Sequence, residues 1–487
     1  MENSINRKLF LILGNIINAI TLLGLLWCNL VSRDIWADEA CTIAIDRNSI
    51  SNITYLTAID VHPPLYYFIV KLFYVLFPWA NENIVGRLVS LLPFVLLWVV
   101  SVFVLIRKLG CISIIFPSML CQFLPLVSHF CEIRMYTWAM FFVVLTAIIG
   151  LCLEENSHLV LWGGIILTSL CAAYTHYFAL VTVFFVWCII GMGHIRSKHF
   201  LFRWFGAGAL VAAGYLPWLY ALLGQMENVY QDYWIAPISY STVRGFFRYI
   251  FSIDVWWIKY FVCGGLVILG AYVLVSFKTG NRKRWFMGTY LLMPVSLILF
   301  GVVISYIFRP VFVNRYVLVA LGVMALGEIL ILTDMHKKLR DWPHLLFGLA
   351  VMGLVIVFGG MNLHRVYQNE NMYSKNWEQM IAAIDSKLDN NAVTFLYIRN
   401  GQPLVRPLTV MYSEYDHLAE NANMSEFNQR LFSTVDYVGQ DISGPVFIVT
   451  GSSEEINEAE YLGLFQTGNG KYNLFYDSHG YKEVENE

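Results

Sequence analysis

The stretch LFLILGNIINAITLLGLLWCNLV, residues 9–31, decides the fold class of this chain. It carries no charged residue, and about 20 apolar residues are enough for a helix to cross a bilayer. The run is too long for a signal peptide and no small-residue cleavage site follows it, so we expect a permanent membrane anchor. In the whole chain 58% of residues are hydrophobic and 14% are charged, against about 25% charged in globular domains. These proportions argue against a purely soluble protein.

Ten further apolar runs are interpreted as membrane spans. They cover residues 85–106, 111–127, 136–153, 159–173, 178–193, 204–223, 256–277, 285–308, 311–332 and 345–361. We therefore expect a mainly α-helical polytopic membrane protein with about eleven transmembrane helices. No span repeats another, and the chain has no glycine-rich loop of the Walker or dinucleotide type.

The last quarter of the chain has a different composition. Residues 1–361 hold 24 Lys and Arg against 16 Asp and Glu (net +8), whereas residues 362–487 hold 8 against 18 (net −10). We expect a transmembrane domain over residues 1–361 and a small soluble α/β domain over residues 362–487. Within the second domain the patterns predict a helix near 377–388, strands near 392–398 and 445–450, and a hairpin near 468–476.

The basic residues of the transmembrane domain predict its orientation. Short segments at residues 7–8, 107–108, 196–203, 278–284 and 337–340 together hold 14 Lys and Arg, which is typical of cytoplasmic loops. The loop at Glu154 and Glu155 is acidic, but acidic residues contribute little to topology. The N-terminus is therefore predicted to be cytoplasmic, and an odd number of spans places the acidic domain outside. The first external loop, residues 32–84, contains short apolar segments at 52–59 and 65–77 that predict helices lying along the membrane surface.

Ionisable residues gather at the turns that this topology places on the outer face. They are Asp38, Glu39, Asp60, His62, Glu132, Arg134, His176, Arg309 and Arg315, with Tyr136 and Tyr177 beside them. Charges at membrane depth are costly unless they are paired or face a wet cavity, which makes such residues functional candidates. A structural interpretation of each stays open: ordinary loop carboxylates, a Glu132–Arg134 ion pair, an interfacial histidine, or arginines that reach to the interface. That interpretation explains poorly why both signs of charge gather on one face.

The set suits a reaction in which a hydroxyl group displaces a phosphate-bearing leaving group. A carboxylate such as Asp38 can accept the hydroxyl proton. Arginines can bind the departing phosphate through paired hydrogen bonds and offset its growing negative charge.

Five motifs resemble those of the multispanning glycosyltransferases of the GT-C fold. The motifs are WADEA (36–40), DVHPPLYY (60–67), EIRMY (132–136), AYTHY (173–177), and Arg309-Pro310 followed by NRY (314–316). The most similar groups are the protein O-mannosyltransferases, the aminoarabinose and galacturonic-acid transferases that modify lipid A, and their bacterial relatives. The resemblance covers about residues 1–330, and the combination of Asp-Glu with His-Pro-Pro-Leu-Tyr is its most specific part.

The resemblance implies an inverting transfer of a sugar from a polyprenyl-phosphate donor to an acceptor hydroxyl at the outer membrane face. Asp38 would be the catalytic base, while Glu39 and His62 would order the first loop or bind the acceptor. The donor would be bound by Glu132, Arg134, Tyr136, His176, Arg309 and Arg315. Similarity to the smaller bacterial relatives implies a plasma (inner) membrane location, with a lipid, cell-surface glycan or protein as acceptor and no nucleic-acid partner.

Other interpretations remain at this stage. We expect no required cofactor, although Asp60, His62 and Glu132 could coordinate a divalent cation. The main alternative function is a transporter or flippase of a lipid-linked saccharide, which would also place arginines against a phosphate. Transporters usually show internal repeats and broken helices near the midplane, and the sequence shows no such repeat. A non-catalytic scaffold would tolerate replacement of Asp38 and of the arginines.

Overall fold

The structure is a computed structural model that describes residues 4–31, 37–154, 158–231, 235–251, 264, 267, 270–271, 273–386, 394–396, 446–450, 471–477 and 480–485. Its contacts divide the chain into two units. The first unit comprises Met1–Trp27 and Ser49–Val366, and the second comprises Cys28–Asn48 and Tyr367–Glu487. The expected boundary at residue 361 falls inside one continuous helix, α18.

Helices make up the described part of the first unit, and α1 and α18 continue from it into the second. They are α1 (Ser4–Val31), α3 (Ile50–Ile59), α4 (Leu65–Leu76), α5 (Glu82–Val100), the π-helix η1 (Ser101–Leu105), α6 (Ile106–Leu109), η2 (Cys111–Ile115), α7 (Phe116–Met119), η3 (Leu120–Gln122), α8 (Leu124–His129), α9 (Tyr136–Leu153), α10 (Leu159–Ala173), α11 (Tyr177–Gly193), α12 (Lys198–Gln231), α13 (Tyr240–Phe251), α15 (Arg282–Leu291), α16 (Met293–Ile307), η4 (Asn314–Val317), α17 (Leu318–Lys338) and α18 (Asp341–Ser386).

Six described helices are long and apolar enough to cross a membrane: Ile5–Leu30, Glu82–Leu109, Tyr136–Leu153, Lys198–Glu227, Asn314–Lys338 and Asp341–Asn369. The pair α15 and α16, bent by 53°, is a seventh candidate. Shorter apolar helices at Cys111–Gln122, Leu159–Ala173 and Tyr177–Gly193 match three more predicted spans. Most of the predicted span 256–277 lies outside the described residues. The chain is thus a polytopic, mainly α-helical membrane protein, and the number eleven stays a prediction.

The predicted span 111–127 differs most from expectation, because it is not one continuous helix. Gly110 ends α6 with φ at +110°, a value that favours glycine. Phe123 is extended and precedes α8, which begins at Leu124 with Pro125 in its first turn. Proline cannot continue a preceding helix without losing a hydrogen bond, so Pro125 separates α8 from the consecutive segments η2, α7 and η3.

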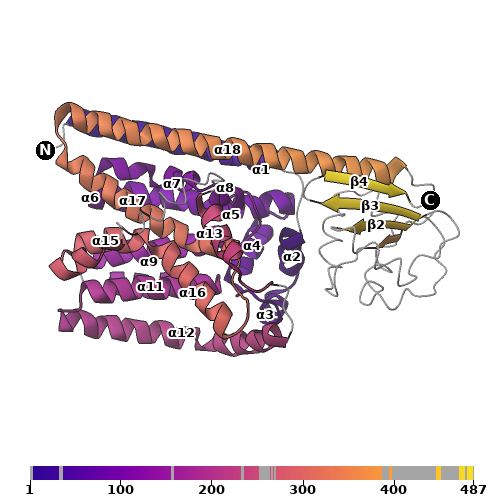
Figure 1. Cartoon of the computed structure of the whole chain (residues 1–487), viewed down its shortest axis with the longest axis horizontal. Coiled ribbons are helices and arrows are strands. Elements are labelled where there is room, and N and C mark those ends of the chain that lie inside the picture. Colours follow the sequence, from indigo (N-terminus) through magenta and orange to yellow (C-terminus); the bar gives the residue numbers. More distant parts are fainter. Residues whose placement is uncertain are drawn as a thin grey trace. The chain divides into compact units, whose positions relative to one another are not determined.

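The core of the first unit lies where α9 packs against α10, α11 and α17. Figure 1 shows α9, α11 and α12 as roughly parallel rods. In the spans Tyr136–Leu153 and Asn314–Lys338, which contain α9 and α17, 78% of the most apolar 18-residue stretch is buried. A side chain at Gly322 of α17 would overlap Met140 of α9, so glycine permits this close approach.

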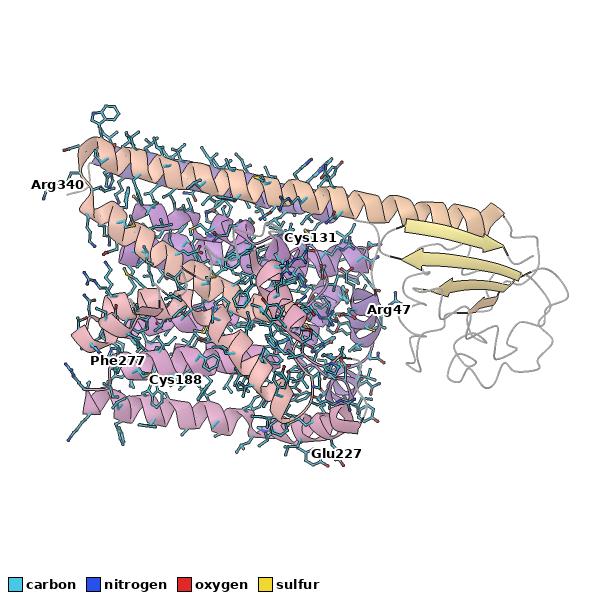
Figure 2. The ribbon with its side chains drawn as sticks, viewed as in Figure 1. Arg47, Cys131, Cys188, Glu227, Phe277 and Arg340 are labelled. Atoms are coloured by element: carbon cyan, nitrogen blue, oxygen red, sulfur yellow. The ribbon has the colours of Figure 1, made fainter. Side chains whose placement is uncertain are left out.

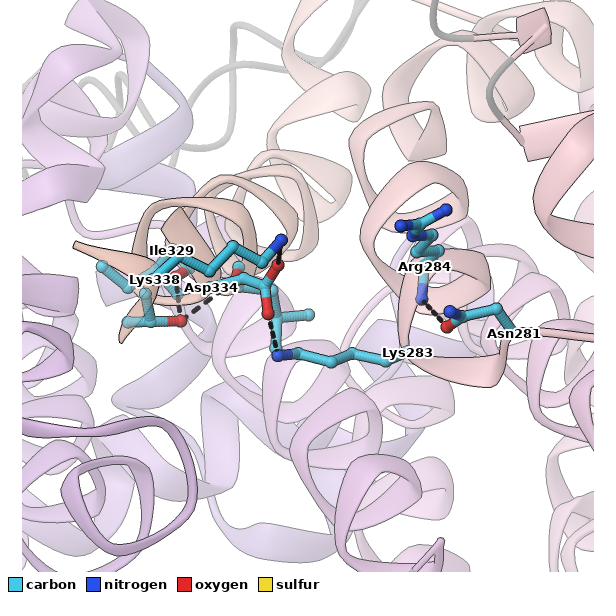
Figure 3. Close-up of polar contacts among 8 residues, drawn as sticks. Asn281, Lys283, Arg284, Ile329, Asp334 and Lys338 are labelled. Carbon is cyan, nitrogen blue, oxygen red and sulfur yellow. Dashed lines mark hydrogen bonds and ion pairs between the residues drawn. The ribbon is translucent and has the colours of Figure 1, made fainter. Parts of the chain in front are cut away.

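Figure 2 labels residues at both ends of this helical bundle: Cys131 and Glu227 lie at one end, and Phe277 and Arg340 lie at the other. At the Arg340 end, the side chain of Asn281 caps α15 by accepting a hydrogen bond from the Arg284 N–H (Figure 3). Lys338 pairs with Asp334 at 2.6 Å, and Lys283 pairs with the same carboxylate. The Lys283–Asp334 pair joins α15 to α17, whereas the Lys338–Asp334 pair lies within α17.

The second unit contains α2 (Ala37–Asp46), the end of α18 and a four-stranded sheet. The strands β1 (Thr394–Leu396), β2 (Val446–Thr450) and β3 (Lys471–Asp477) pair in parallel, and β4 (Gly480–Glu485) pairs antiparallel with β3. Two predicted strands are found as β1 and β2. The antiparallel pair formed by β3 and β4 lies later in the chain than the predicted hairpin at residues 468–476. The helix expected at 377–388 is the end of α18.

Candidate functional site

Two turns of the first unit carry buried histidines that stack on each other. His62 lies between α3 and α4, and His176 lies between α10 and α11. Their ring centroids are 5.9 Å apart with an interplanar angle of 29°. The backbone N–H of Leu65 donates to the carbonyl of Tyr174 at 2.9 Å, which joins the two turns directly. This bond fixes the segment between α3 and α4 against the α10–α11 turn.

Arg134, in the turn between α8 and α9, contacts this histidine pair and is 4% exposed. Its Nη2 donates to Nε2 of His62 at 3.2 Å. A guanidinium group can only donate, so this ring nitrogen of His62 carries no proton. His176 caps α11, because its Nδ1 accepts a hydrogen bond from the Phe178 N–H at 3.1 Å. Both histidines are therefore held by contacts that need an acceptor nitrogen.

The electrostatics of the two turns keep both histidines neutral. Burial, followed by the positive charges of Arg134 and Arg315, lowers the pKa of His176 to about 3. Burial is also the main cause that holds the pKa of His62 well below its usual value. Arg134, then His176 and Arg315, add to that effect. We name His62, Arg134, His176 and Arg315 the His–Arg cluster. Arg134 is buried and Arg315 is half-buried, and both guanidinium groups add positive charge beside the histidines.

Aromatic rings enclose the His–Arg cluster. The ring of Tyr316, beside Arg315 in η4, lies 5.0 Å from that of His176, and the ring of Tyr136 lies 5.4 Å from it. Phe178 stacks on Tyr316 at 5.0 Å. Tyr136 is fully buried and Tyr316 is 5% exposed. Such walls exclude water and so strengthen the field of the arginines.

Glu132 lies beside the cluster in the α8–α9 turn. Its carboxylate accepts a hydrogen bond from the Ser128 hydroxyl at 2.9 Å, and Nε2 of His129 lies 3.6 Å from the other carboxylate oxygen. The ring of His129 in turn packs edge-on against Tyr136 at 5.0 Å. Contacts with Ser128 and His129 therefore hold Glu132 next to the aromatic wall.

Three predicted residues, Glu132, Tyr136 and Arg315, influence the pKa of Tyr249 in α13. Burial is the main cause that raises its pKa well above the usual value. Glu132 and Tyr136 raise it further, while Arg315 lowers it. Helix α13 packs against α8 and η4. The structure thus brings Glu132, Tyr136 and Arg315 together around one phenol.

Helix α12 is hydrogen-bonded to the end of α3 and to Tyr177 through Gln225. The Gln225 side chain is 3% exposed and donates to the carbonyls of Thr57 and Ala58 at 2.8 and 3.1 Å. These carbonyls belong to the last turn of α3, where no partner exists within the helix. Gln225 also accepts a hydrogen bond from the Tyr177 hydroxyl. The end of α3, and with it the turn that holds His62, is fixed to α12.

The remaining predicted residues are Asp38, Glu39 and Arg309. Asp38 and Glu39 form the first turn of α2 in the second unit; Asp38 is half-buried and Glu39 is 2% exposed. Carboxylates at that position are favoured by the helix dipole. Arg309 is half-buried in the turn that links α16 to η4. The arginine next to both histidines, besides Arg134, is Arg315.

The structure also bears on the metal hypothesis. Among the residues it describes, no group of three His, Cys, Asp or Glu side chains could hold a metal ion. Asp60, His62 and Glu132 do not form such a group, and the His62 Nε2 lone pair is directed at Arg134. These residues do not fit a divalent cation.

Two residues of the site were not predicted. His129 belongs to no motif and lies two residues after the apolar run 111–127, and its i, i+3 spacing to Glu132 is the sequence signal that could identify it. Tyr249 lies between the predicted spans 204–223 and 256–277, in a segment where the sequence predicts no site residue. Its signal was the amphipathic pattern of Tyr240–Phe251, a helix whose Phe246 and Ile250 are buried.

The arrangement is suited to binding a phosphate. Arg134 and Arg315 supply positive charge in a water-poor site, and the neutral histidines add hydrogen-bonding groups without adding charge. A bound anion would lower the cost of burying the Arg134 guanidinium group, beside which Arg315 is half-buried.

Comparisons with known proteins identify the fold of this chain. No protein-family model and no curated protein matches the chain. Two crystal structures of ArnT from Cupriavidus metallidurans are similar, one in the apo state and one bound to undecaprenyl phosphate. Their TM-scores are 0.53 and 0.51 at 13% identity, covering 94% of this chain and 92% of ArnT. The chain therefore has the fold of the GT-C membrane glycosyltransferases, as its motifs predict.

Proposed function

We propose that this protein is a glycosyltransferase that moves a sugar from a polyprenyl-phosphate donor to an acceptor hydroxyl, with inversion at the sugar. The observation that carries the proposal is the His–Arg cluster, in which two arginines face two neutral buried histidines. A neighbour in structure binds undecaprenyl phosphate, which supports a lipid phosphate as the ligand. The acceptor is a lipid, a cell-surface glycan or a protein.

Within this proposal Arg134 and Arg315 bind the phosphate of the donor and stabilise the charge that develops as the sugar leaves. Arg309, in the turn that precedes η4 and Arg315, adds to this binding. Glu132 and Tyr136 contact the donor beside them, and His62 and His176 shape the pocket without carrying charge.

Asp38 is the proposed general base. A carboxylate that takes the acceptor proton leaves the hydroxyl oxygen free to attack the anomeric carbon, while the phosphate leaves with the bonding electrons. Inversion follows because the attack is direct and comes from the face opposite the leaving phosphate. Glu39, which is buried one residue later, orders the helix that carries the base.

The proposal includes an orientation and a location. The protein lies in the plasma membrane, with its N-terminus in the cytoplasm and the acidic domain outside, and transfer requires no metal. Full activity in excess chelator is the expected result.

The test combines transfer and binding measurements on purified protein in membranes. Asp38→Asn is expected to lower transfer about 10²- to 10⁴-fold while undecaprenyl phosphate still binds. Arg134→Gln and Arg315→Gln are each expected to weaken undecaprenyl phosphate binding about 10- to 100-fold, the cost of losing a charged hydrogen bond. Arg282→Gln, an exposed arginine at the other end of the bundle, is the matched control.

Two outcomes would overturn the proposal. Full transfer by Asp38→Asn would remove the base and favour the alternative function, transport of a lipid-linked saccharide. Unchanged lipid-phosphate binding in both arginine variants would show that the His–Arg cluster is structural.

A further inference from the structure

A second site lies at the far end of α9 from the His–Arg cluster. It is a groove of about 810 Å³ between the end of α9, the start of α10 and the segment formed by η1 and α6. Helix α9 begins at Tyr136 beside the cluster and reaches the groove at Cys152. At 1.5 Å per residue the two sites are about 24 Å apart. The groove is therefore separate from the proposed active site.

The groove combines basic groups with apolar walls. Arg107 and Lys108 of α6 and His158 before α10 line it, and no acidic residue is among the described residues that do. The walls include Phe103, which is 58% exposed, and Val160, which is 83% exposed. A surface of this kind matches a ligand with an anionic head and an apolar chain.

The backbone around the groove is also irregular. Ser101–Leu105 forms one turn of π-helix between α5 and α6, and Phe103 and Val104 of this turn line the groove. Such turns are rare and occur mostly at functional sites. Gly110 then ends α6 two residues after Lys108. The basic pair thus lies between a π-turn and a helix end.

We propose that this groove binds an anionic glycerophospholipid, with its phosphate at Arg107 and Lys108 and an acyl chain along Phe103, Leu159 and Val160. Basic pockets between membrane helices on the cytoplasmic side commonly bind anionic head groups. The predicted orientation places the groove in the cytoplasmic leaflet. The site does not depend on the proposed transferase activity, because its ligand, location and residues all differ.

Native mass spectrometry of the detergent-solubilised full chain tests the proposal. The probes are phosphatidylglycerol and phosphatidylcholine with identical acyl chains, each titrated into delipidated protein. Wild-type protein is expected to retain phosphatidylglycerol in preference to phosphatidylcholine. Arg107→Gln alone, at an exposed side chain, is expected to weaken phosphatidylglycerol about 5-fold, and Arg107→Gln with Lys108→Gln about 25-fold.

The matched control removes two charges from the same end of the bundle but outside the groove. Lys278→Gln with Arg282→Gln is expected to change phosphatidylglycerol affinity less than 2-fold. Equal loss in both double variants would show general charge attraction and would overturn the site, as would equal binding of the two lipids. Displacement of phosphatidylglycerol by about 10 mM inorganic phosphate would assign the groove to free phosphate and would also overturn it. Arg107→Gln decides the question if the double variant does not fold.

Discussion

One end of the helical bundle holds the buried Arg134, whereas Lys283 and Lys338 at the other end are exposed. At the first end Arg134 is 4% exposed and makes its hydrogen bond to a histidine that is 7% exposed. At the other end Lys338 and Lys283 pair with Asp334, and the two lysine side chains are 68% and 52% exposed. The same residue types thus occur in two different environments.

The difference separates two uses of charge in a membrane protein. Exposed ion pairs contribute about 0–1 kcal/mol, and basic residues there chiefly set the orientation of the helices. Burying charged groups without function is costly, so the buried end is where a ligand is expected. Substitutions of one type made at both ends test this contrast directly.

The largest expected effect follows from adding a charge at the buried end. His176→Lys places a cation beside Arg134 and Arg315, and we expect it to destabilise the protein by about 3–5 kcal/mol or to prevent folding. His199→Lys, at an exposed position of α12 at the other end, is expected to cost less than about 0.5 kcal/mol. Thermal unfolding in detergent measures both. Similar losses of stability in His176→Lys and His199→Lys would show that the two ends of the bundle do not differ in how they tolerate an added charge.

The second effect is a pH dependence of stability. His176 titrates at about 3 in the folded protein and near its usual pKa of about 6.5 when unfolded, so the unfolded state binds the proton more strongly between these values. Stability is complete above about pH 7 and falls with decreasing pH, by about 2 kcal/mol at pH 5 from His176 alone.

His62, whose pKa is also lowered, acts in the same direction. His176→Asn keeps an acceptor for the Phe178 N–H and is expected to make the loss between about pH 7 and pH 5 smaller. An identical pH profile in the variant would show that His176 is not the group that titrates.

A smaller effect is expected at Gln225. Replacing it with leucine removes the donors that satisfy the carbonyls of Thr57 and Ala58, at a cost of about 1–3 kcal/mol. Tyr220→Phe, at a side chain of the same helix that is 86% exposed, is the control. Transfer activity should fall along with stability, because His62 follows α3 in the chain. An unchanged melting temperature in Gln225→Leu would show that these hydrogen bonds do not stabilise the contact between α3 and α12.

The smallest effect is expected for Asp334→Asn at the exposed end. It removes both lysine pairs, yet the change in stability should stay within about 1 kcal/mol and should shrink further in high salt. A loss as large as that of Gln225→Leu would mean that the exposed ion pairs hold the bundle together.

The sequence predicted the parts of the fold that depend on apolar run length. Spans such as 136–153 and 159–173 coincide with α9 and α10, because no internal signal interrupts them. The break inside 111–127 was not predicted, since Pro125 alone does not tell a kinked helix from an ended one. The continuation of α18 past residue 361 was also missed, because a helix that leaves the membrane changes composition without changing structure.

The site was predicted residue by residue but not as an arrangement. Turn motifs indicated His62, Arg134, His176 and Arg315, and the structure gathers them. The stacking of His62 on His176 depends on how α4 meets the α10–α11 turn, which no spacing within one segment encodes. Residues without a charge or a motif, such as Tyr249, are recognisable only from their neighbours in space.

The hydrogen bond from the Leu65 N–H to the Tyr174 carbonyl has an evolutionary consequence. Both atoms belong to the main chain, so the side chains at these two positions can change freely without breaking the bond. Proline at position 65 is the exception, because it has no N–H to donate. We therefore expect that relatives of this protein can vary at positions 65 and 174 and still keep the bond that joins the two turns.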